Sequence, residues 1–258
     1  MKKDYTEIVS ESYQNIWEDK LNDLQKEFQD TGILVFDEFL QSESLEELQQ
    51  EAEELSSEIY RSSTSYNPFV ESEDNTPSEK LRSVRFTTEK GCVCYDQIPD
   101  ESILKTLYNG EEFQNFLSSI LWVSKIFPYA DSLAGINVNY YNPGDSLEWH
   151  YDNCNFTITL LVKKPDSGGI YEYFSNQRYD SNWKEDYQKV EKMIDGSLSP
   201  ETVDLEEATL VIFRGTESLH RVTPIESGQR ILVTFCYNPV EWISLSETSR
   251  MTFFGRLK

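Results

Sequence analysis

Two histidines and one aspartate are the residues of this sequence best suited to hold a metal ion. The chain contains only two histidines, His150 and His220, and Asp152 follows the first by two positions. Side chains two apart on a strand point to the same face, so His150 and Asp152 can converge on one ion. A second imidazole from a distant strand would complete two nitrogens and one carboxylate, which is typical of iron(II) enzymes that bind a co-substrate and O2 together. The sequence therefore predicts a metal site at His150, Asp152 and His220.

Arg230 follows the second histidine at a position that suits the anchoring of a co-substrate. It comes just after the turn 226–229, at the start of the last predicted strand. If this turn closes a hairpin, Arg230 and His220 belong to adjacent antiparallel strands of one sheet. A guanidinium binds a carboxylate through two parallel charge-assisted hydrogen bonds. A keto acid with two carboxylates needs such an anchor when its other end chelates iron.

The alternative interpretation is that both histidines are ordinary core or surface residues and that Arg230 makes a surface ion pair. Acidic residues are frequent, 46 of 258, so an aspartate two positions after a histidine is weak evidence alone. The metal site is favoured because the histidines, the same-face carboxylate, the strand context and the arginine all agree.

The first half of the chain must supply a supporting layer, and residues 1–130 are expected to be mainly helical. Apolar spacing predicts a helix over 12–29, and the apolar run 33–36 predicts a buried strand. A capping box at Ser44–Glu47 is expected to open the next helix. Further helices are predicted over 101–108 and 111–121. The polar, proline-containing range 61–80 is expected to be a long loop, either a lid over the site or a flexible segment.

The second half, residues 134–258, is expected to form an antiparallel β-core. Strands and one helical insertion are predicted over 136–140, 156–162, 170–174, 182–195 (the helix), 208–213, 220–225 and 231–237. Short strands at this density indicate a sandwich or barrel rather than a parallel sheet. The predicted fold class is α+β, with N-terminal helices packed on the β-core in one domain spanning 1–258.

The range 136–237 resembles the double-stranded β-helix, or jelly-roll, core of iron(II)/2-oxoglutarate-dependent oxygenases. His150, Asp152 and His220 match the metal ligands of that superfamily, and Arg230 matches its co-substrate anchor. The chain is more closely similar to the free amino-acid radical halogenases and related hydroxylases in the segments 149–150, 156–161, 168–173, 213–215, 219–224 and 253–256. The resemblance implies Fe(II), 2-oxoglutarate and O2 as the cofactor and co-substrates, and a small-molecule substrate such as a free amino acid.

Asp152 marks one departure from the halogenases of that group. They carry a small residue at this position, which vacates a coordination site for chloride. A carboxylate fills that site here, so the resemblance implies hydroxylation of an aliphatic C–H bond rather than chlorination.

Two further residues are candidates for binding the substrate. Arg85 resembles the position at which the amino-acid group uses an arginine to hold its substrate, although a plain surface arginine is an equal alternative. Asn153 corresponds to residues that approach the substrate, yet it faces away from Asp152 if the strand stays regular. Asn137 and Asn139 share one strand face and are either donors to 2-oxoglutarate or exposed.

Composition limits the class of partner. The formal net charge is −23, and no concentrated basic stripe offsets it, so nucleic acid is excluded as a partner. The acidic balance reflects solubility or, as a slighter hint, a cationic substrate such as lysine or arginine. No secretory signal or membrane-spanning run is recognised, and four cysteines do not form a disulfide framework, so a cytoplasmic protein is expected. Two alternatives to the small-molecule hydroxylase stay open: hydroxylation of a protein residue, and a non-catalytic β-sandwich that binds a metal such as zinc.

Overall fold

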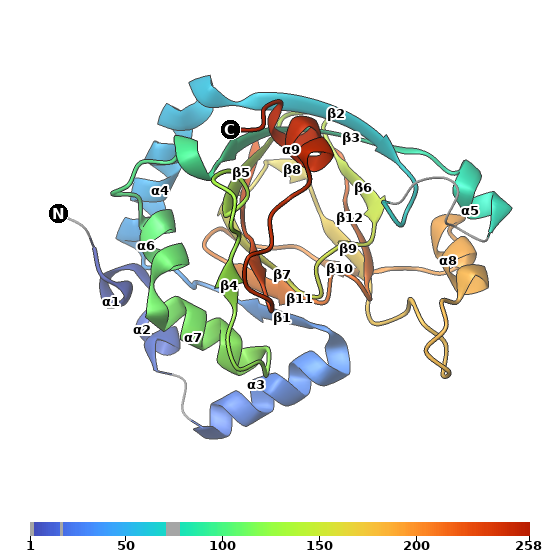
Figure 1. Cartoon of the computed structure of the whole chain (residues 1–258), viewed down its shortest axis with the longest axis horizontal. Coiled ribbons are helices and arrows are strands. Elements are labelled where there is room, and N and C mark those ends of the chain that lie inside the picture. The colour runs from blue at the N-terminus through green and yellow to red at the C-terminus, as the bar shows by residue number, and fades with distance from the viewer. Residues whose placement is uncertain (1–2, 16–17, 71–77) are drawn as a thin grey trace.

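The computed structural model describes residues 3–15, 18–70 and 78–258, and over these residues two antiparallel sheets face each other as a jelly roll (Figure 1). The larger sheet has the strand order β1 (Ile33–Phe36), β11 (Leu210–Phe213), β7 (Thr157–Lys163), β14 (Arg230–Phe235), β5 (Ile136–Tyr141), β3 (Phe86–Cys94) and β2 (Tyr60–Tyr66). The smaller sheet has the order β10 (Glu201–Val203), β9 (Tyr171–Phe174), β12 (Leu219–Val222) and β6 (Leu147–His150). Short pairs join β13 (Ile225–Ser227) to β8 (Ser167–Gly168), and β15 (Tyr237–Asn238) to β4 (Phe127–Pro128).

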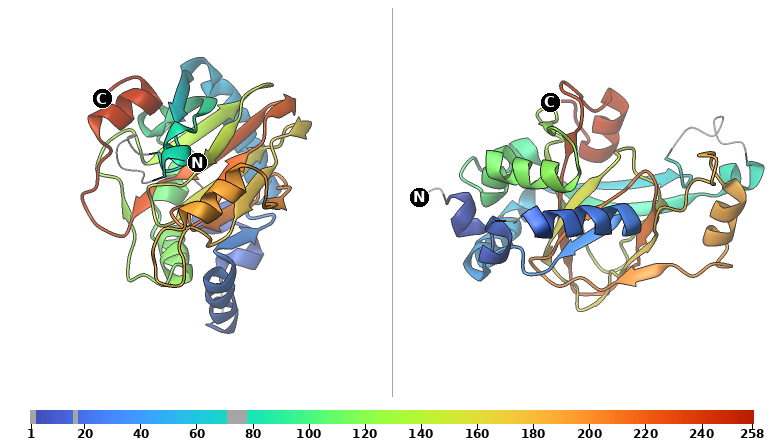
Figure 2. Two further views of the ribbon diagram at one scale, coloured as in Figure 1. Left: turned by 90° about the vertical axis from the view of Figure 1, so that its right-hand side faces the viewer. Right: turned by 90° about the horizontal axis from the view of Figure 1, so that it is seen from below.

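Helices cover the outer faces of both sheets (Figure 1; Figure 2). The larger sheet is covered by α1 (Tyr5–Ile8), α2 (Glu11–Gln14), α3 (Glu18–Thr31), α4 (Ser42–Glu54), α6 (Ile103–Asn109) and α7 (Glu111–Ile120). At the opposite side, α5 (Glu79–Ser83) and α8 (Tyr187–Ile194) pack behind the smaller sheet. The C-terminal α9 (Glu247–Phe254) lies against β2 and β3, and the 3-10 turns η1 (Leu55–Glu58) and η2 (Tyr95–Gln97) complete the layer. The predicted α+β class with a jelly-roll core is confirmed.

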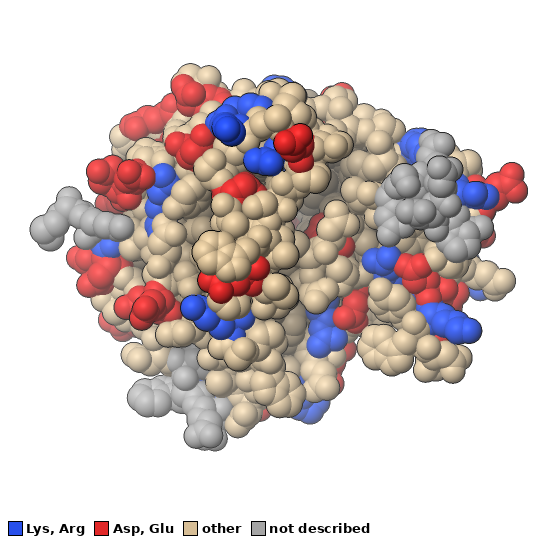
Figure 3. All heavy atoms as spheres, viewed as in Figure 1, with Lys and Arg blue, Asp and Glu red and all other residues tan. Residues whose placement is uncertain are grey.

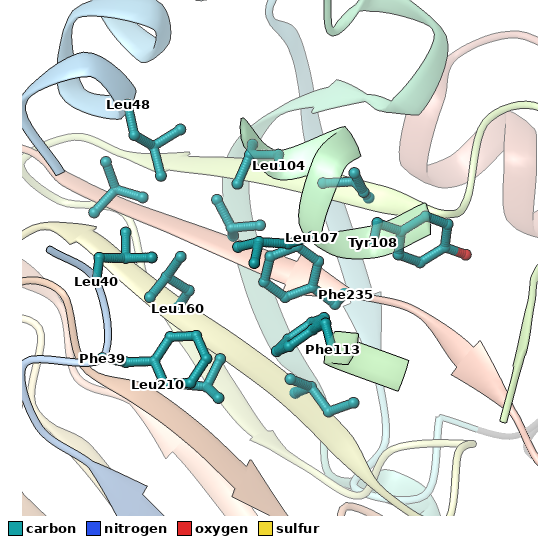
Figure 4. Packing of buried hydrophobic residues seen from close by; sticks show 14 of the residues in the cluster. Phe39, Leu40, Leu48, Leu104, Leu107, Tyr108, Phe113, Leu160, Leu210 and Phe235 are labelled. Carbon is teal, nitrogen blue, oxygen red and sulfur yellow. The ribbon is translucent and has the colours of Figure 1, made fainter. Parts of the chain in front are cut away.

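Alternation along the strands of the larger sheet separates a solid core from a cavity. On one face, Leu160, Leu210 and Phe235 pack against the helices, and Figure 4 shows Leu104 and Phe113 pointing at them. The intervening side chains of the same strands point toward the smaller sheet, because successive strand residues face opposite sides. The sequence alternation therefore decides which residues stabilise the fold and which line the cavity.

The N-terminal half is less purely helical than the sequence predicts. The expected loop over 61–80 is wrong for its first part, because Tyr60–Tyr66 forms β2 at the edge of the larger sheet, paired with β3. An edge strand with polar, partly exposed residues carries no apolar alternation, which explains why the sequence pattern did not reveal it. Residues 71–77 of that expected loop or lid lie outside the described residues.

The predicted capping box is also wrong. Helix α4 begins at Ser42 with Gln41 as its N-cap, so Ser44 lies inside the helix. Ser44 is fully buried, and its hydroxyl donates to the carbonyl of Glu7 at the packed junction with α1. Tertiary packing therefore uses a residue whose local pattern indicated a helix start.

None of the helices in the described ranges is long and apolar enough to cross a lipid bilayer.

Candidate metal centre

The structure brings His150, Asp152 and His220 together on the inner side of the smaller sheet. Strands β6 and β12 pair with His220 directly opposite His150, and the two ring centroids lie 4.2 Å apart. The Asp152 carboxylate lies 3.3 Å from Nε2 of His150 and 3.7 Å from Nε2 of His220. One ligand atom from each residue falls within 4.8 Å of the others, which is close enough for all of them to contact one ion.

Backbone carbonyls orient both imidazoles. Nδ1 of His150 lies 2.7 Å from the carbonyl oxygen of Glu148, and Nδ1 of His220 lies 2.9 Å from that of Ser218. A carbonyl only accepts hydrogen bonds, so Nδ1 carries the proton in each ring and the lone pair of Nε2 faces Asp152. Such hydrogen bonds are the usual way in which proteins fix the tautomer of a metal-binding histidine.

The charges of the three side chains suit a cation. Burial, with a smaller contribution from the neighbouring His150, lowers the pKa of His220 to about 4, so this ring is neutral at pH 7. Burial raises the pKa of the Asp152 carboxyl, but the two imidazoles and the Thr157 hydroxyl lower it by more, so the pKa lies below its usual range. Nitrogen lone pairs and an ionised carboxylate aimed at one small space are the donor set that fits a divalent metal.

Asp152 reaches this position from outside the strand. Strand β6 ends at His150, and the backbone N–H of Asp152 donates to the carbonyl of Gly215, 3.0 Å away. A Cβ on Gly215 would lie only 2.4 Å from Oδ2 of Asp152, so the glycine makes room for the carboxylate. The intervening Tyr151 is buried in the cluster behind the smaller sheet. The rule that side chains two apart share a strand face therefore pairs Asp152 with His150 correctly, although Asp152 lies in the segment that follows β6 and not in the strand.

Thr157 holds the carboxylate from β7. Its hydroxyl donates to Oδ2 of Asp152 across the gap between the two sheets. Thr157→Val is expected to weaken iron(II) binding by about 10–100-fold, the usual effect of losing a hydrogen bond behind a metal ligand. The matched control is Thr159→Val, because Thr159 lies on the same face of β7 and has no hydrogen bond to Asp152. Anaerobic titration with iron(II) measures both variants, and equal affinities in the two would contradict this supporting role.

Arg230 lies in a different sheet from His220, so the predicted hairpin between their strands is wrong. Strand β12 belongs to the smaller sheet and β14 to the larger one. The residues between them form β13, which pairs with β8 while the chain crosses from one sheet to the other. A jelly roll places consecutive strands in opposite sheets, so His220 and Arg230 face each other across the cavity.

The guanidinium of Arg230 has the surroundings of an anion-binding group. Arg230 is only 2% exposed, and its Nη1 has no hydrogen-bond partner among the described residues. The nearest aromatic contact is Tyr141, whose ring centroid lies 5.7 Å from the guanidinium carbon. Burial lowers the pKa of this group, with Tyr141 opposing the shift, yet arginine stays protonated in proteins. A buried cation without a counter-charge is costly, and a carboxylate ligand removes that cost.

A cavity of about 820 Å³ joins the triad to Arg230. Its walls include Asn137 and Asn139, the inner residues of β5, and Asn139 is buried and donates to the Leu232 carbonyl and the Thr234 hydroxyl. The candidate substrate residues Arg85 and Asn153 also line the cavity, and both are exposed. Arg85 donates to the carbonyls of Arg82 and Val84.

Several lining residues were not identified from the sequence. Lys90 projects into the cavity from β3, a strand that sequence reasoning did not predict, although Thr88, Lys90 and Cys92 alternate along it. Phe253 and Phe254 enter from α9. Trp149 and Trp242 are not among the lining residues that the structure describes.

Comparison with known proteins agrees with this geometry. The sequence model of the family described as halogenase D matches residues 16–252. A search of curated proteins found no significant match. A solved oxidoreductase of the 2OG-Fe(II) oxygenase family from Burkholderia pseudomallei is similar in fold, with a TM-score of 0.58 and 9% identity over 89% of this chain and 96% of that one.

Two further solved structures share the architecture. The non-haem alpha-ketoglutarate-dependent carbocyclase SnoK from nogalamycin biosynthesis has a TM-score of 0.58 and 11% identity, with 95% of each chain covered. A Pseudomonas putida prolyl-4-hydroxylase has a TM-score of 0.53 and 14% identity over 84% of this chain and 98% of that one. At these identities the likeness establishes the fold.

Proposed function

Since the chain belongs to the halogenase D family, we propose that it is an iron(II)/2-oxoglutarate-dependent oxygenase that hydroxylates an aliphatic C–H bond of a small molecule. The observation that carries hydroxylation, rather than halogenation, is the carboxylate of Asp152. It occupies the third corner of the triad, beside both Nε2 atoms. A halide would need that coordination position, and Thr157 and Gly215 fix the carboxylate in it.

Each residue of the site has a separate part in this function. His150, Asp152 and His220 would hold Fe(II), and Arg230 would bind the distal carboxylate of 2-oxoglutarate. When bound, iron and the keto acid supply the oxidising power, as O2 gives one oxygen atom to the substrate C–H bond and one to the succinate formed with CO2. We take residues 1–258 to form one oxygenase domain that acts in the cytoplasm, where its four cysteines, all free in the structure, stay reduced.

The protein itself positions the substrate and excludes water from it. The cavity wall is largely apolar, with Phe156, Leu232 and Phe253 among its residues. An apolar wall excludes bulk water from the reacting C–H bond and strengthens the interactions with the few polar groups present. Arg85 and Asn153, at the exposed side of the cavity, are candidate contacts for a free amino acid or a derivative of one.

Product analysis tests the proposed reaction. The protein with iron(II), 2-oxoglutarate and O2 is screened against small carboxylic and amino acids for substrate-dependent succinate formation. The reaction is then repeated in excess chloride, and the product is identified by mass spectrometry. We expect the product to gain one oxygen atom in both cases, because Asp152 leaves no position for a halide. A chlorinated product would overturn the assignment as a hydroxylase.

A further inference from the structure

A second cationic side chain, that of the half-buried Lys90, lines the same cavity, and the proposed co-substrate does not need it. Lys90 lies on β3, and Thr88 and Cys92, two positions away on either side, also line the cavity. In the pairing of β3 with β5, Gly91 lies opposite Tyr140, which places Lys90 beside Tyr141. Tyr141 in turn lies opposite Arg230 on β14. Lys90 and Arg230 therefore lie in one row across the inner face of the sheet. Their strands, β3 and β14, are separated by β5, which puts the two backbones about 10 Å apart across the sheet.

The ammonium of Lys90 is held in place but not neutralised. Nζ donates to Oδ1 of Asn139 over 2.8 Å, and the amide nitrogen of Asn139 is fixed by the Leu232 carbonyl and the Thr234 hydroxyl. No carboxylate forms an ion pair with Lys90 among the residues that the structure describes. A lysine has three N–H donors, so two remain for a ligand in the cavity.

The charges of the residues that line the cavity indicate the charge of the ligand that Lys90 would bind. Of the described lining residues, Asp152 is the only acidic one, whereas Arg85, Lys90 and Arg230 are basic. In the proposed complex, the charges of iron(II) and Arg230 balance those of Asp152 and the two carboxylates of 2-oxoglutarate. Lys90 then remains as an uncompensated positive charge in the cavity. Among the lining residues that the structure describes, a cationic substrate would find only the carboxylate of Asp152, which iron would engage, and it would be repelled by Lys90.

The acidity of the whole protein does not alter this conclusion. The net charge of −23 arises from acidic side chains that are scattered over the outside, as the face in Figure 3 shows. Exposed charges at this distance are screened by salt, whereas charges within the cavity act on the ligand directly. The surface charge therefore affects solubility and encounter, and the cavity charge selects the substrate.

Resting on the oxygenase assignment above, we propose that the substrate is a small carboxylic acid with an uncharged, largely apolar body, and that Lys90 binds its carboxylate. The apolar body fits the wall formed by Leu245, Phe253 and Phe254 from the C-terminal segment. An amino acid with an uncharged side chain belongs to this class, because its side chain is the uncharged body and its ammonium and carboxylate leave no net charge. Lysine, arginine and other cationic molecules do not.

Three probes with the same aliphatic chain test this proposal: hexanoate, hexanamide and hexylamine. Each is titrated by calorimetry, without O2, into the protein loaded with iron(II) and saturating 2-oxoglutarate. We expect hexanoate to bind about tenfold more tightly than hexanamide, as a charge-assisted hydrogen bond allows, and hexylamine to bind most weakly. Lys90→Met should remove the preference for hexanoate, and Lys90→Arg should keep it. Lys26→Met, which removes an exposed lysine on α3, should also keep it.

The outcomes separate this inference from the proposed function. Failure of the wild-type protein to bind 2-oxoglutarate overturns both, before any probe is added. Tighter binding of hexylamine than of hexanoate, or no binding of hexanoate, overturns the substrate class alone. A hexanoate preference that survives in Lys90→Met overturns the role of Lys90. If that variant instead loses affinity for 2-oxoglutarate, Lys90 is a second anchor for the co-substrate.

Discussion

Arg230→Met is expected to weaken 2-oxoglutarate binding by about 30-fold or more while iron(II) binding is retained. The guanidinium is buried, its Nη1 has no partner in the described residues, and it faces the triad across the cavity. Removing one partner of a buried, hydrogen-bonded charge pair costs about 2–5 kcal/mol, which corresponds to a loss of this size. Calorimetric titration of 2-oxoglutarate into the anaerobic iron(II) protein measures the loss.

The same substitution is expected to stabilise the ligand-free protein. An unpaired buried cation destabilises the fold, and methionine fills a similar volume without the charge. A higher melting temperature together with lost co-substrate binding would distinguish the loss of an anchor from simple misfolding. The control is Arg221→Met, because Arg221 lies next to His220 on β12 but pairs with Glu172 and stacks on Trp149, away from the cavity. Unchanged 2-oxoglutarate affinity in Arg230→Met would contradict the role of Arg230 as the anchor of the co-substrate.

Asp152→Ala is expected to abolish hydroxylation and to make iron binding dependent on halide. The loss of a direct ligand should exceed the about 10–100-fold effect of losing a supporting hydrogen bond. Removing the carboxylate also opens the position beside both Nε2 atoms to an external anion. Iron(II) affinity of the variant should therefore rise when chloride replaces sulfate in the buffer, and the wild type should not respond.

Iron titrations in the two buffers measure this effect. Asp152→Asn is the matched variant, because it keeps the size of the side chain and removes the negative charge. Wild-type iron affinity in Asp152→Ala would contradict the assignment of Asp152 as a ligand. The absence of a chloride response would contradict the reasoning that the carboxylate occupies a halide position.

Local sequence patterns predicted most strands of the β-core, but not the sheet to which each strand belongs. The shared strand face of Asn137 and Asn139 was predictable, because side-chain direction depends only on the strand itself. Strand pairing depends on distant segments. The local turn at 226–229 therefore suggested a hairpin, where the structure has a crossing between sheets.

The geometry of the candidate site was predicted to a similar degree. His150, Asp152 and His220 were identifiable because histidine is rare in this chain and because few residue types bind a metal. Lys90 was not, because one lysine among many carries no signal until β3 is known to lie beside β5. Its importance comes from its surroundings, which only the fold provides.

The most direct test of the central assignment is an anaerobic visible absorption spectrum of the iron(II) protein before and after 2-oxoglutarate is added. We predict a new charge-transfer band when the keto acid chelates the metal, absent in His150→Ala and weakened in Arg230→Met. Iron bound without such a band would contradict the co-substrate assignment, and failure of the wild-type protein to bind iron(II) would contradict the triad itself.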